Sequence, residues 1–248
     1  MEIKIVIPAR MKGTRLPGKP LIKVYGKTIL ERVWERCIKV LDTKDVYVAT
    51  EDSEILNFCN KKNIKCVKTK KAGTAIDRIK LFSDVIKSDL YINVQGDEPV
   101  FNIKDLRKLI SYAKRFPRRV VFGKTKCTKK EFYDYSKAKV VCDINNKLLY
   151  SSRAGLPINN KGQYIKAERA IWLYSFYKES LDNYYNFKKK TYLEKIEDNE
   201  IIRFLEIGID VYCIDMIGDS WAIDEKKDLI VLKNILKNEK NNNYWLHQ

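Results

Sequence analysis

Short apolar runs alternate with longer amphipathic stretches along the first half of the chain. Residues 3–7 are a β-branched run that stops at Pro8, which predicts a buried strand, and residues 28–40 repeat their apolar side chains with a helical period. The alternation continues with predicted strands at 45–49, 64–67 and 90–94, and predicted helices from Ser53 onward, at 75–86 and at 103–113. Strands that alternate with helices predict a parallel sheet covered by helices on both faces, with its ligand site at the carboxyl ends of the strands.

The pattern changes in the middle of the chain. Three strand-like segments that lie close together in sequence predict antiparallel pairing: 120–122, 138–142 and 148–150. We therefore expect an antiparallel insertion over about 120–177. The remaining predicted elements are a helix near 197–206, a strand at 210–214 and a closing helix at 224–236. The predicted fold class is α/β, a mostly parallel sheet flanked by helices with an antiparallel insertion, in a single domain of residues 1–248.

Composition excludes several kinds of chemistry. The chain has 248 residues, of which 45% are hydrophobic and 33% charged, which suits a folded protein with a substantial core. Its single histidine, His247, lies next to the C-terminus, so a His-based catalytic triad and a His-rich zinc site are excluded. Carboxylates, lysine, arginine, backbone amides or a hard metal ion must therefore carry any reaction.

Cysteine spacing and hydropathy bear on the compartment. None of the six cysteines forms a C-x-x-C pair, and most have apolar neighbours, which predicts buried free thiols in a reducing cytosol. No apolar run approaches the ~20 residues that a membrane span needs, and residues 1–8 are unlike a secretory signal. We expect a cytoplasmic protein without a membrane span.

A basic loop follows the first predicted strand. It runs from Pro8 to Lys19, is shaped by glycine and proline, and carries Arg10, Lys12 and Arg15 as well as Lys19. Such a loop at a strand end can offer cationic side chains and backbone N–H groups to a polyphosphate. It lacks the P-loop spacing, and a solvated basic loop is the alternative.

Two acidic positions could hold a metal ion. Asp97 follows the buried strand at 90–94 in the segment Asn-Val-Gln-Gly-Asp-Glu-Pro, which suits Mg²⁺ bound together with substrate phosphates. The alternative for Asp97 is a turn residue. Asp224 precedes the closing helix, where it could be either an N-cap or a second Mg²⁺ ligand.

Five segments together resemble one enzyme family. They are Ile-Pro-Ala-Arg at 7–10, Thr-Arg-Leu-Pro-Gly-Lys-Pro at 14–20, Asn-Val-Gln-Gly-Asp-Glu-Pro at 93–99, Ser-Arg-Ala at 152–154 and Ala-Ile-Asp at 222–224. In order and spacing they resemble 3-deoxy-manno-octulosonate (Kdo) cytidylyltransferase, the CMP-Kdo synthetase, over essentially the whole chain. The resemblance implies a Rossmann-like nucleotidyltransferase that uses Mg²⁺ and transfers CMP from CTP to a sugar acid, with release of pyrophosphate. It also implies a homodimer formed through the insertion, and a role in lipopolysaccharide or capsule synthesis.

The resemblance assigns roles to individual residues. The implied nucleotide-binding residues are Pro8, Ala9, Arg10, Arg15, Lys19, Thr74, Arg78 and Gln95. The implied catalytic residues are Arg10, Lys19 and Asp97, and the implied Mg²⁺ ligands are Asp97 and Asp224. The implied acceptor-binding residues are Gln95, Arg153, Tyr174 and Glu200.

The chain departs from the family on the acceptor side. Ala170 and Trp172 stand where the family has His and Gly, and Ile201 stands where it has Gln. The lost His and Gln are polar groups that the family uses on the sugar acid, and losing a buried polar partner costs about 1–3 kcal/mol. We therefore expect an intact CTP side and an acceptor that is Kdo, a related ulosonic acid or another small acidic molecule.

The net charge raises a different class of function. The chain has 49 Lys and Arg against 32 Asp and Glu, a formal charge of +17, which suggests nucleic-acid binding as an alternative function. The lysines are spread along the whole chain rather than gathered on one element, so we expect no specific nucleic-acid partner. An inactive homologue that still binds nucleotide is a third possibility, against which the retained Asp97 and Asp224 argue.

Overall fold

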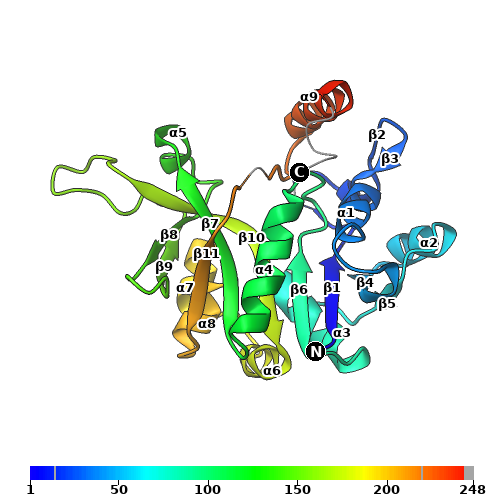
Figure 1. Cartoon of the computed structure of the whole chain (residues 1–248), viewed down its shortest axis with the longest axis horizontal. Coiled ribbons are helices and arrows are strands. Elements are labelled where there is room, and N and C mark those ends of the chain that lie inside the picture. Colours follow the sequence, from blue (N-terminus) through cyan, green and yellow to red (C-terminus); the bar gives the residue numbers. More distant parts are fainter. Residues whose placement is uncertain (14, 219, 243–248) are drawn as a thin grey trace.

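A computed structural model describes residues 1–13, 15–218 and 220–242, with the backbone alone at 239–242. Thr14 of the basic loop and His247 lie outside the described residues. The described chain forms one mixed sheet with helices on both sides (Figure 1). None of the described helices is long and apolar enough to cross a membrane.

The sheet is parallel on one side and mixed on the other. Its main path has the order β11-β7-β10-β6-β1-β4-β5, and β1 lies between its parallel neighbours β6 and β4. The long strand β10 runs antiparallel to both β6 and β7, while β11 is parallel to β7. The strands of this path are β1 (Ile3–Pro8), β4 (Val46–Thr50), β5 (Cys66–Lys68), β6 (Leu90–Val94), β7 (Val120–Cys127), β10 (Ala167–Tyr177) and β11 (Val211–Asp215).

Helices cover both faces because successive strand residues point to opposite sides. Ile5 and Ile7 of β1 belong to the core cluster shared with α1, α2 and α4, whereas Val6 between them belongs to the cluster shared with α3, α6 and α8. The helices are α1 (Ile29–Cys37), α2 (Ser53–Lys61), α3 (Ala75–Val85), α4 (Ile103–Arg115), α5 (Lys129–Phe132), α6 (Lys178–Asn186), α7 (Tyr192–Glu197), α8 (Ile202–Glu206) and α9 (Lys226–Asn242), with 3-10 turns η1 (Lys19–Leu21) and η2 (Thr43–Asp45).

The expected antiparallel segment divides into two parts. Its first and last strands, β7 and β10, are integral to the central sheet. Only β8 (Lys139–Cys142) and β9 (Leu148–Ser152) lie off the main path, where β8 pairs with β10 and β9. The chain between β9 and β10 then extends away from the sheet at the left of Figure 1.

Most predicted elements exist, with a few differences. The structure adds a small hairpin, β2 (Lys23–Val24) with β3 (Lys27–Thr28), and the helices α5, α6 and α7, which the sequence pattern did not indicate. The helix predicted near 197–206 is shorter and begins at Ile202, because residues 198–201 form a turn. The closing helix begins at Lys226 rather than at 224.

Candidate active site

Two loops meet at the carboxyl ends of the parallel neighbours β1 and β6. Gly96, in the loop after β6, lies against the carbonyl oxygen of Pro8 at the end of β1. A Cβ atom at this position would stand 2.6 Å from that oxygen. Only glycine permits this approach, so the close contact of the two loops depends on its missing side chain.

The basic loop is held in a defined shape. The Met11 N–H donates to Asp52 Oδ2 at 2.8 Å, and the Gly18 N–H donates to the Met11 carbonyl at 2.9 Å. Gly18 has a φ of 69°, in the left-handed region that favours glycine, and η1 begins directly after it. The closed loop presents Lys19 to a hollow between the two loops, and the side chains of Arg10, Lys12 and Arg15 are solvent-exposed.

This nucleotide-side hollow has a volume of about 240 Å³ and combines cations with two carboxylates. Arg78 lines it from α3 with its guanidinium buried, 2.8 Å from Thr69 Oγ1 and 3.5 Å from Glu51 Oε2. The residues predicted to bind nucleotide or metal that line this hollow are Pro8, Ala9, Arg10, Arg15, Lys19, Thr74, Arg78, Gln95, Asp97 and Asp224.

Lys19 joins the two carboxylates. Its Nζ lies 2.6 Å from Asp97 Oδ2 and 3.4 Å from Asp224 Oδ1, and Arg15 lies 3.1 Å from the same Asp224 oxygen. Charged residues more than 200 positions apart in sequence are thus in direct contact. The ammonium group occupies the place between two carboxylates where a cation is most stabilised.

Asp224 is held at the site by the neighbouring backbone. The Ile223 N–H donates to the Asp97 carbonyl at 2.9 Å, which fixes the segment before α9 against the loop after β6. The backbone N–H groups of Asp224 and Glu225 both donate to Asp228 Oδ2 at 2.8 Å. Asp228 therefore fixes the backbone just before α9. Because α9 begins at Lys226, Asp224 lies one residue before the N-cap position, and its carboxylate faces Lys19 and Arg15.

The two carboxylates suit a hard cation that is bound partly by the protein and partly by oxygen atoms of the substrate. Asp97 and Asp224 supply carboxylate oxygens on either side of one positive group. Within the described ranges, no cluster of three or more His, Cys, Asp or Glu side chains forms a complete protein cage for a metal. Mg²⁺ characteristically binds through one or two carboxylates together with phosphate oxygens and water, so the pair fits Mg²⁺ better than a transition metal.

A second hollow of about 280 Å³ adjoins the first and shares Arg10, Arg15, Asp97 and Asp224 with it. Its far wall comes from β10 and from the turns before α7 and α8. We call it the acceptor-side hollow. Its further lining residues include Arg153, Trp172, Lys190, Asp198, Asn199 and Glu200, and it also touches Gln95 and Glu98.

Two carboxyl groups in this hollow hold their protons unusually firmly. Burial raises the pKa of Glu200 to about 7, although its carboxylate accepts a hydrogen bond from the Ile76 N–H at 3.1 Å. Burial raises the pKa of Glu98 to about 8, and the charge of Asp97 raises it further. A neutral acid at pH 7 can donate a hydrogen bond, which an ionised one cannot.

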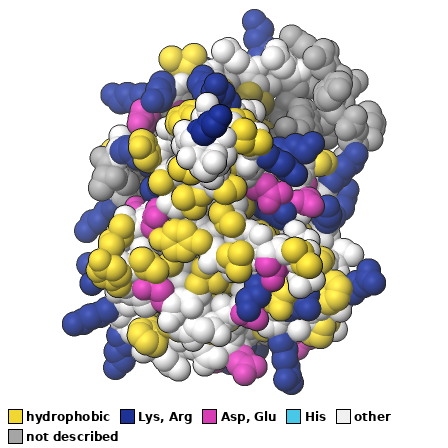
Figure 2. Space-filling model, turned by 90° about the vertical axis from the view of Figure 1, so that its left-hand side faces the viewer, with side chains coloured by type: hydrophobic (Ala, Val, Ile, Leu, Met, Phe, Trp, Pro, Cys, Tyr) yellow, Lys and Arg dark blue, Asp and Glu magenta, His cyan; other side chains and the backbone are white. Residues whose placement is uncertain are grey.

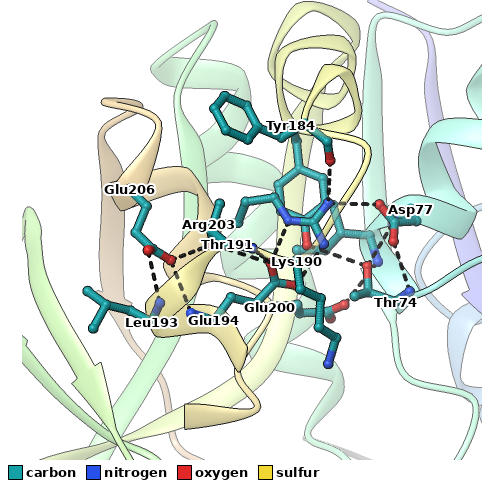
Figure 3. Close-up of polar contacts among 12 residues, drawn as sticks. Thr74, Asp77, Tyr184, Lys190, Thr191, Leu193, Glu194, Glu200, Arg203 and Glu206 are labelled. Carbon is teal, nitrogen blue, oxygen red and sulfur yellow. Dashed lines mark hydrogen bonds and ion pairs between the residues drawn. The ribbon is translucent and has the colours of Figure 1, made fainter. Parts of the chain in front are cut away.

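A buried ionic network connects residues of α3, α6, α7 and α8 next to the hollows (Figure 3). Arg203 binds Glu194 through two contacts of 2.7 Å, lies 3.1 Å from Asp77 Oδ1 and stacks over the Tyr184 ring at 4.0 Å. Asp77 and Thr74 cap each other at the start of α3. The network thereby links α8, next to Glu200, with the first turn of α3, which carries Thr74 into both hollows.

Comparison with known proteins identifies the family. The model of the cytidylyltransferase family matches residues 4–215. A 3-deoxy-manno-octulosonate cytidylyltransferase of Koribacter versatilis is 33% identical over 237 residues, which cover 94% of this chain and 89% of that protein. The chain belongs to the 3-deoxy-manno-octulosonate cytidylyltransferase family. The resemblance and the nucleotidyltransferase class predicted from the motifs are confirmed.

One further relative is named for a different acceptor, and a solved structure is named for the same one. An 8-amino-3,8-dideoxy-manno-octulosonate cytidylyltransferase of Shewanella halifaxensis is 30% identical over 239 residues, which cover 92% of this chain and 96% of that protein. A solved CMP:2-keto-3-deoxy-manno-octonic acid synthetase in complex with CTP is 26% identical, has a TM-score of 0.89, and is matched over 96% of this chain and 100% of its own. The predicted fold class is confirmed by this likeness.

Three of the four predicted acceptor-binding residues of this cytidylyltransferase line the acceptor-side hollow, and the fourth does not. Gln95, Arg153 and Glu200 line the acceptor-side hollow. Arg153 is held by its Nε, which donates to the Glu197 carbonyl at 2.8 Å. Tyr174 is fully buried and is absent from the described residues that line either hollow. Of the departures from the family, Ala170 and Ile201 are buried in the core, and only Trp172 reaches the hollow.

Sequence reasoning missed several residues of the site. Lys190 is the last of three consecutive lysines at 188–190, and it lines the acceptor-side hollow and lies 3.0 Å from Asp198. Asp52 and Arg36 shape the loops from outside, and Arg36 donates to the Pro99 carbonyl at 2.9 Å. No spacing in the sequence marks these residues, because their partners lie on distant segments.

Proposed function

We propose that this cytidylyltransferase transfers CMP from CTP to Kdo or a related ulosonic acid, in a Mg²⁺-dependent reaction that releases pyrophosphate. The observation that carries the proposal is the convergence of Arg10, Arg15 and Lys19 with Asp97 and Asp224 in one hollow at the ends of β1 and β6. The product is a CMP-activated sugar of the kind used for lipopolysaccharide or another surface polysaccharide.

The reaction needs positioning and charge neutralisation more than acid–base chemistry. The anomeric hydroxyl of the acceptor attacks the α-phosphorus of CTP, and the new O–P bond forms as the bond to the pyrophosphate oxygen breaks. The hydroxyl proton passes to solvent water in the same reaction. Arg10, Arg15 and Lys19 would bind the triphosphate and offset the charge that develops on its oxygens, with Pro8, Ala9, Thr74, Arg78 and Gln95 around the nucleotide.

Mg²⁺ is the cofactor that we propose for this site. Asp97 and Asp224 would hold it, since both offer carboxylate oxygens to the same position between the loops. When bound, Mg²⁺ supplies positive charge to the phosphate oxygens. Lys19 limits the repulsion between the two carboxylates, because its ammonium group contacts both.

The acceptor would bind in the adjoining hollow. Arg153, Lys190 and the shared Arg10 give this hollow the positive charge that a sugar acid requires, and Glu200 and Gln95 offer hydrogen bonds to hydroxyl groups. The relatives act on Kdo or on its 8-amino-8-deoxy derivative. Ala170 and Ile201 add no polar group, so we propose an ulosonic acid related to Kdo as the preferred acceptor.

We also propose a homodimer formed through the segment between β7 and β10. Figure 2 looks onto this side of the molecule and shows hydrophobic side chains gathered over it. Its exposed large apolar residues include Tyr133, Tyr135, Ile144, Leu149, Ile158 and Ile165. A second copy of the chain would bury this surface.

Sedimentation equilibrium tests the dimer. The variants Leu149→Asp and Ile165→Asp should sediment as monomers at concentrations at which the native protein is dimeric. Ile230→Asp, on exposed α9, is the matched control and should leave the mass unchanged. A native protein that is monomeric at high concentration would contradict this part of the proposal.

All six cysteines are free, and most of them are buried. Reduced thiols agree with the reducing cytosol in which CTP is available, and we propose a cytoplasmic location.

Product analysis tests the activity. Incubation with CTP, Mg²⁺ and a set of ulosonic acids should give pyrophosphate and a CMP-linked sugar in equal amounts, identified by mass spectrometry. A chelator should stop the reaction, and added Mg²⁺ should restore it. Absence of any CMP-linked product with every ulosonic acid would overturn the proposal.

A further inference from the structure

Trp172 lies at an irregularity in β10. The pairing of β10 with β7 shifts register between Ile171 and Tyr174, so Trp172 falls within a β-bulge. Bulges re-aim side chains and often occur beside active sites. The half-buried indole lines the acceptor-side hollow and packs against Phe122 and Tyr174, with ring centroids 5.9 Å and 6.3 Å away.

Two buried polar atoms on residues that contact Trp172 have no partner in the described part of the chain. They are the Tyr174 hydroxyl and Asn93 Oδ1. Tyr174 and Asn93 face each other across β10 and β6, and Asn93 Nδ2 donates to the Trp172 carbonyl at 3.5 Å. Buried polar atoms are rarely left unpaired in folded proteins, so this pair marks a place where polar contacts are possible but unused.

The side chain that carries the unpaired hydroxyl packs against the lining of the acceptor-side hollow. Tyr174 is fully buried, and its ring centroid lies 6.3 Å from that of Trp172. Trp172 itself lines the hollow. The indole therefore connects the buried Tyr174 with the side on which the acceptor would bind.

We propose that Trp172 determines which ulosonic acid the enzyme accepts, because its indole gives the acceptor-side hollow an apolar wall in front of the Tyr174 hydroxyl and Asn93 Oδ1. This inference rests on the function proposed above. The favoured acceptor presents carbon-bound hydrogen to this wall, at a position where a more hydroxylated acid would present O–H. An aromatic face stabilises C–H groups by contact but cannot satisfy a hydroxyl group that has lost its water.

Acceptor kinetics on the native enzyme give the first test. The panel contains Kdo, its 8-amino-8-deoxy derivative and Kdo analogues in which one hydroxyl at a time is replaced by hydrogen. We expect at least one analogue with hydrogen in place of a hydroxyl to exceed Kdo in kcat/KM by about tenfold. If Kdo has a higher kcat/KM than each of these analogues, the inference is wrong.

Substitution of the indole gives the second test. Trp172→Ala should raise the ratio of kcat/KM for Kdo to that for the favoured analogue at least about tenfold, whereas Trp172→Phe should retain the native ratio. Adding Tyr174→Phe to Trp172→Ala should cancel the gain, since the newly uncovered hydroxyl would be absent. An unchanged ratio in Trp172→Ala, or a gain that survives in the double variant, contradicts the role of Trp172.

Two further measurements separate the possible failures. Thermal unfolding and the Kd for CTP should be near native in each variant used, and the analogue series on the native enzyme decides the question if Trp172→Ala does not fold. If the native enzyme releases no pyrophosphate with any ulosonic acid, the proposed function itself is wrong. If the enzyme is active but its acceptor preference is the same with and without the indole, only the inference about Trp172 is wrong.

Discussion

The two adjoining hollows differ in how the chain builds them. The nucleotide-side hollow comes mainly from two loops after neighbouring parallel strands, and all of the residues predicted for nucleotide and metal line it. The acceptor-side hollow comes from short segments around Arg153, Trp172 and Glu200, and one predicted contact, Tyr174, is buried in the core and does not line it. A binding site made of continuous motifs can be recognised in the sequence. A site assembled from single, scattered side chains leaves no such motif, so a change in its specificity is hard to recognise from the sequence.

The largest effect should come from the nucleotide side. Asp97→Asn replaces a charged metal ligand by a neutral amide and should lower pyrophosphate release about 10³-fold. Asp210→Asn, at an exposed ion pair outside both hollows, is the matched control and should retain native activity. Near-native activity of Asp97→Asn would rule out the metal assignment and, with it, the contrast between the hollows.

The buried ionic network around Arg203 should have the next largest effect. Arg203→Leu leaves the buried Glu194 and Asp77 carboxylates without their cation, and should lower the free energy of unfolding by about 3 kcal/mol. Urea unfolding measures this loss. Lys147→Leu removes an exposed ion pair to Asp210 and should cost under about 1 kcal/mol. Similar losses in the two variants would show that the network does not hold the hollows together.

A pH dependence distinguishes the acceptor side. The pKa of Glu200, raised to about 7 by burial, exceeds its value in the unfolded chain, so the native state binds this proton more tightly. Stability contributed by Glu200 is therefore present below pH 4 and is lost as the pH rises towards 8. Glu200→Gln should match the native protein in urea unfolding at pH 4.5 and exceed it by roughly 2 kcal/mol at pH 8. A difference that does not vary with pH would contradict the buried, protonated state.

The smallest effect should come from a lysine at the rim of the acceptor-side hollow. Lys190→Ala should raise the KM for the acceptor about two- to fivefold and leave the KM for CTP unchanged, because a partly exposed charge contributes little. Lys188→Ala, two residues away and exposed, should change neither constant. A larger effect on CTP than on the acceptor would reverse the assignment of the two hollows.

Much of this architecture could be predicted because local sequence carried the signal. The β-branched run of β1, the helical period of α1 and the Gly-Asp-Glu-Pro segment after β6 depend on residues close together in the chain. The contact of Lys19 with Asp224 spans 205 positions, and only the fold brings the pair together. Tyr174 was expected at the acceptor from the family motif, but the motif does not reveal that a bulge aims Trp172 at the hollow.

The same limit explains the misread elements. β10 appeared to belong to an antiparallel insertion because its neighbours in sequence are antiparallel, yet it is central to the main sheet. Asp224 resembled an N-cap because it precedes a helix, but α9 begins two residues later at Lys226, and the Asp224 carboxylate contacts Lys19 and Arg15.

One kinetic matrix tests the central claim that the nucleotide side is conserved in function while the acceptor side has changed. Pyrophosphate release is measured with each of four nucleoside triphosphates against Kdo, its 8-amino-8-deoxy derivative and its deoxy analogues. The account predicts that CTP is preferred with every acceptor and that an acid other than Kdo has the highest kcat/KM. Preference for another nucleotide, or Kdo as the best acceptor, would contradict it.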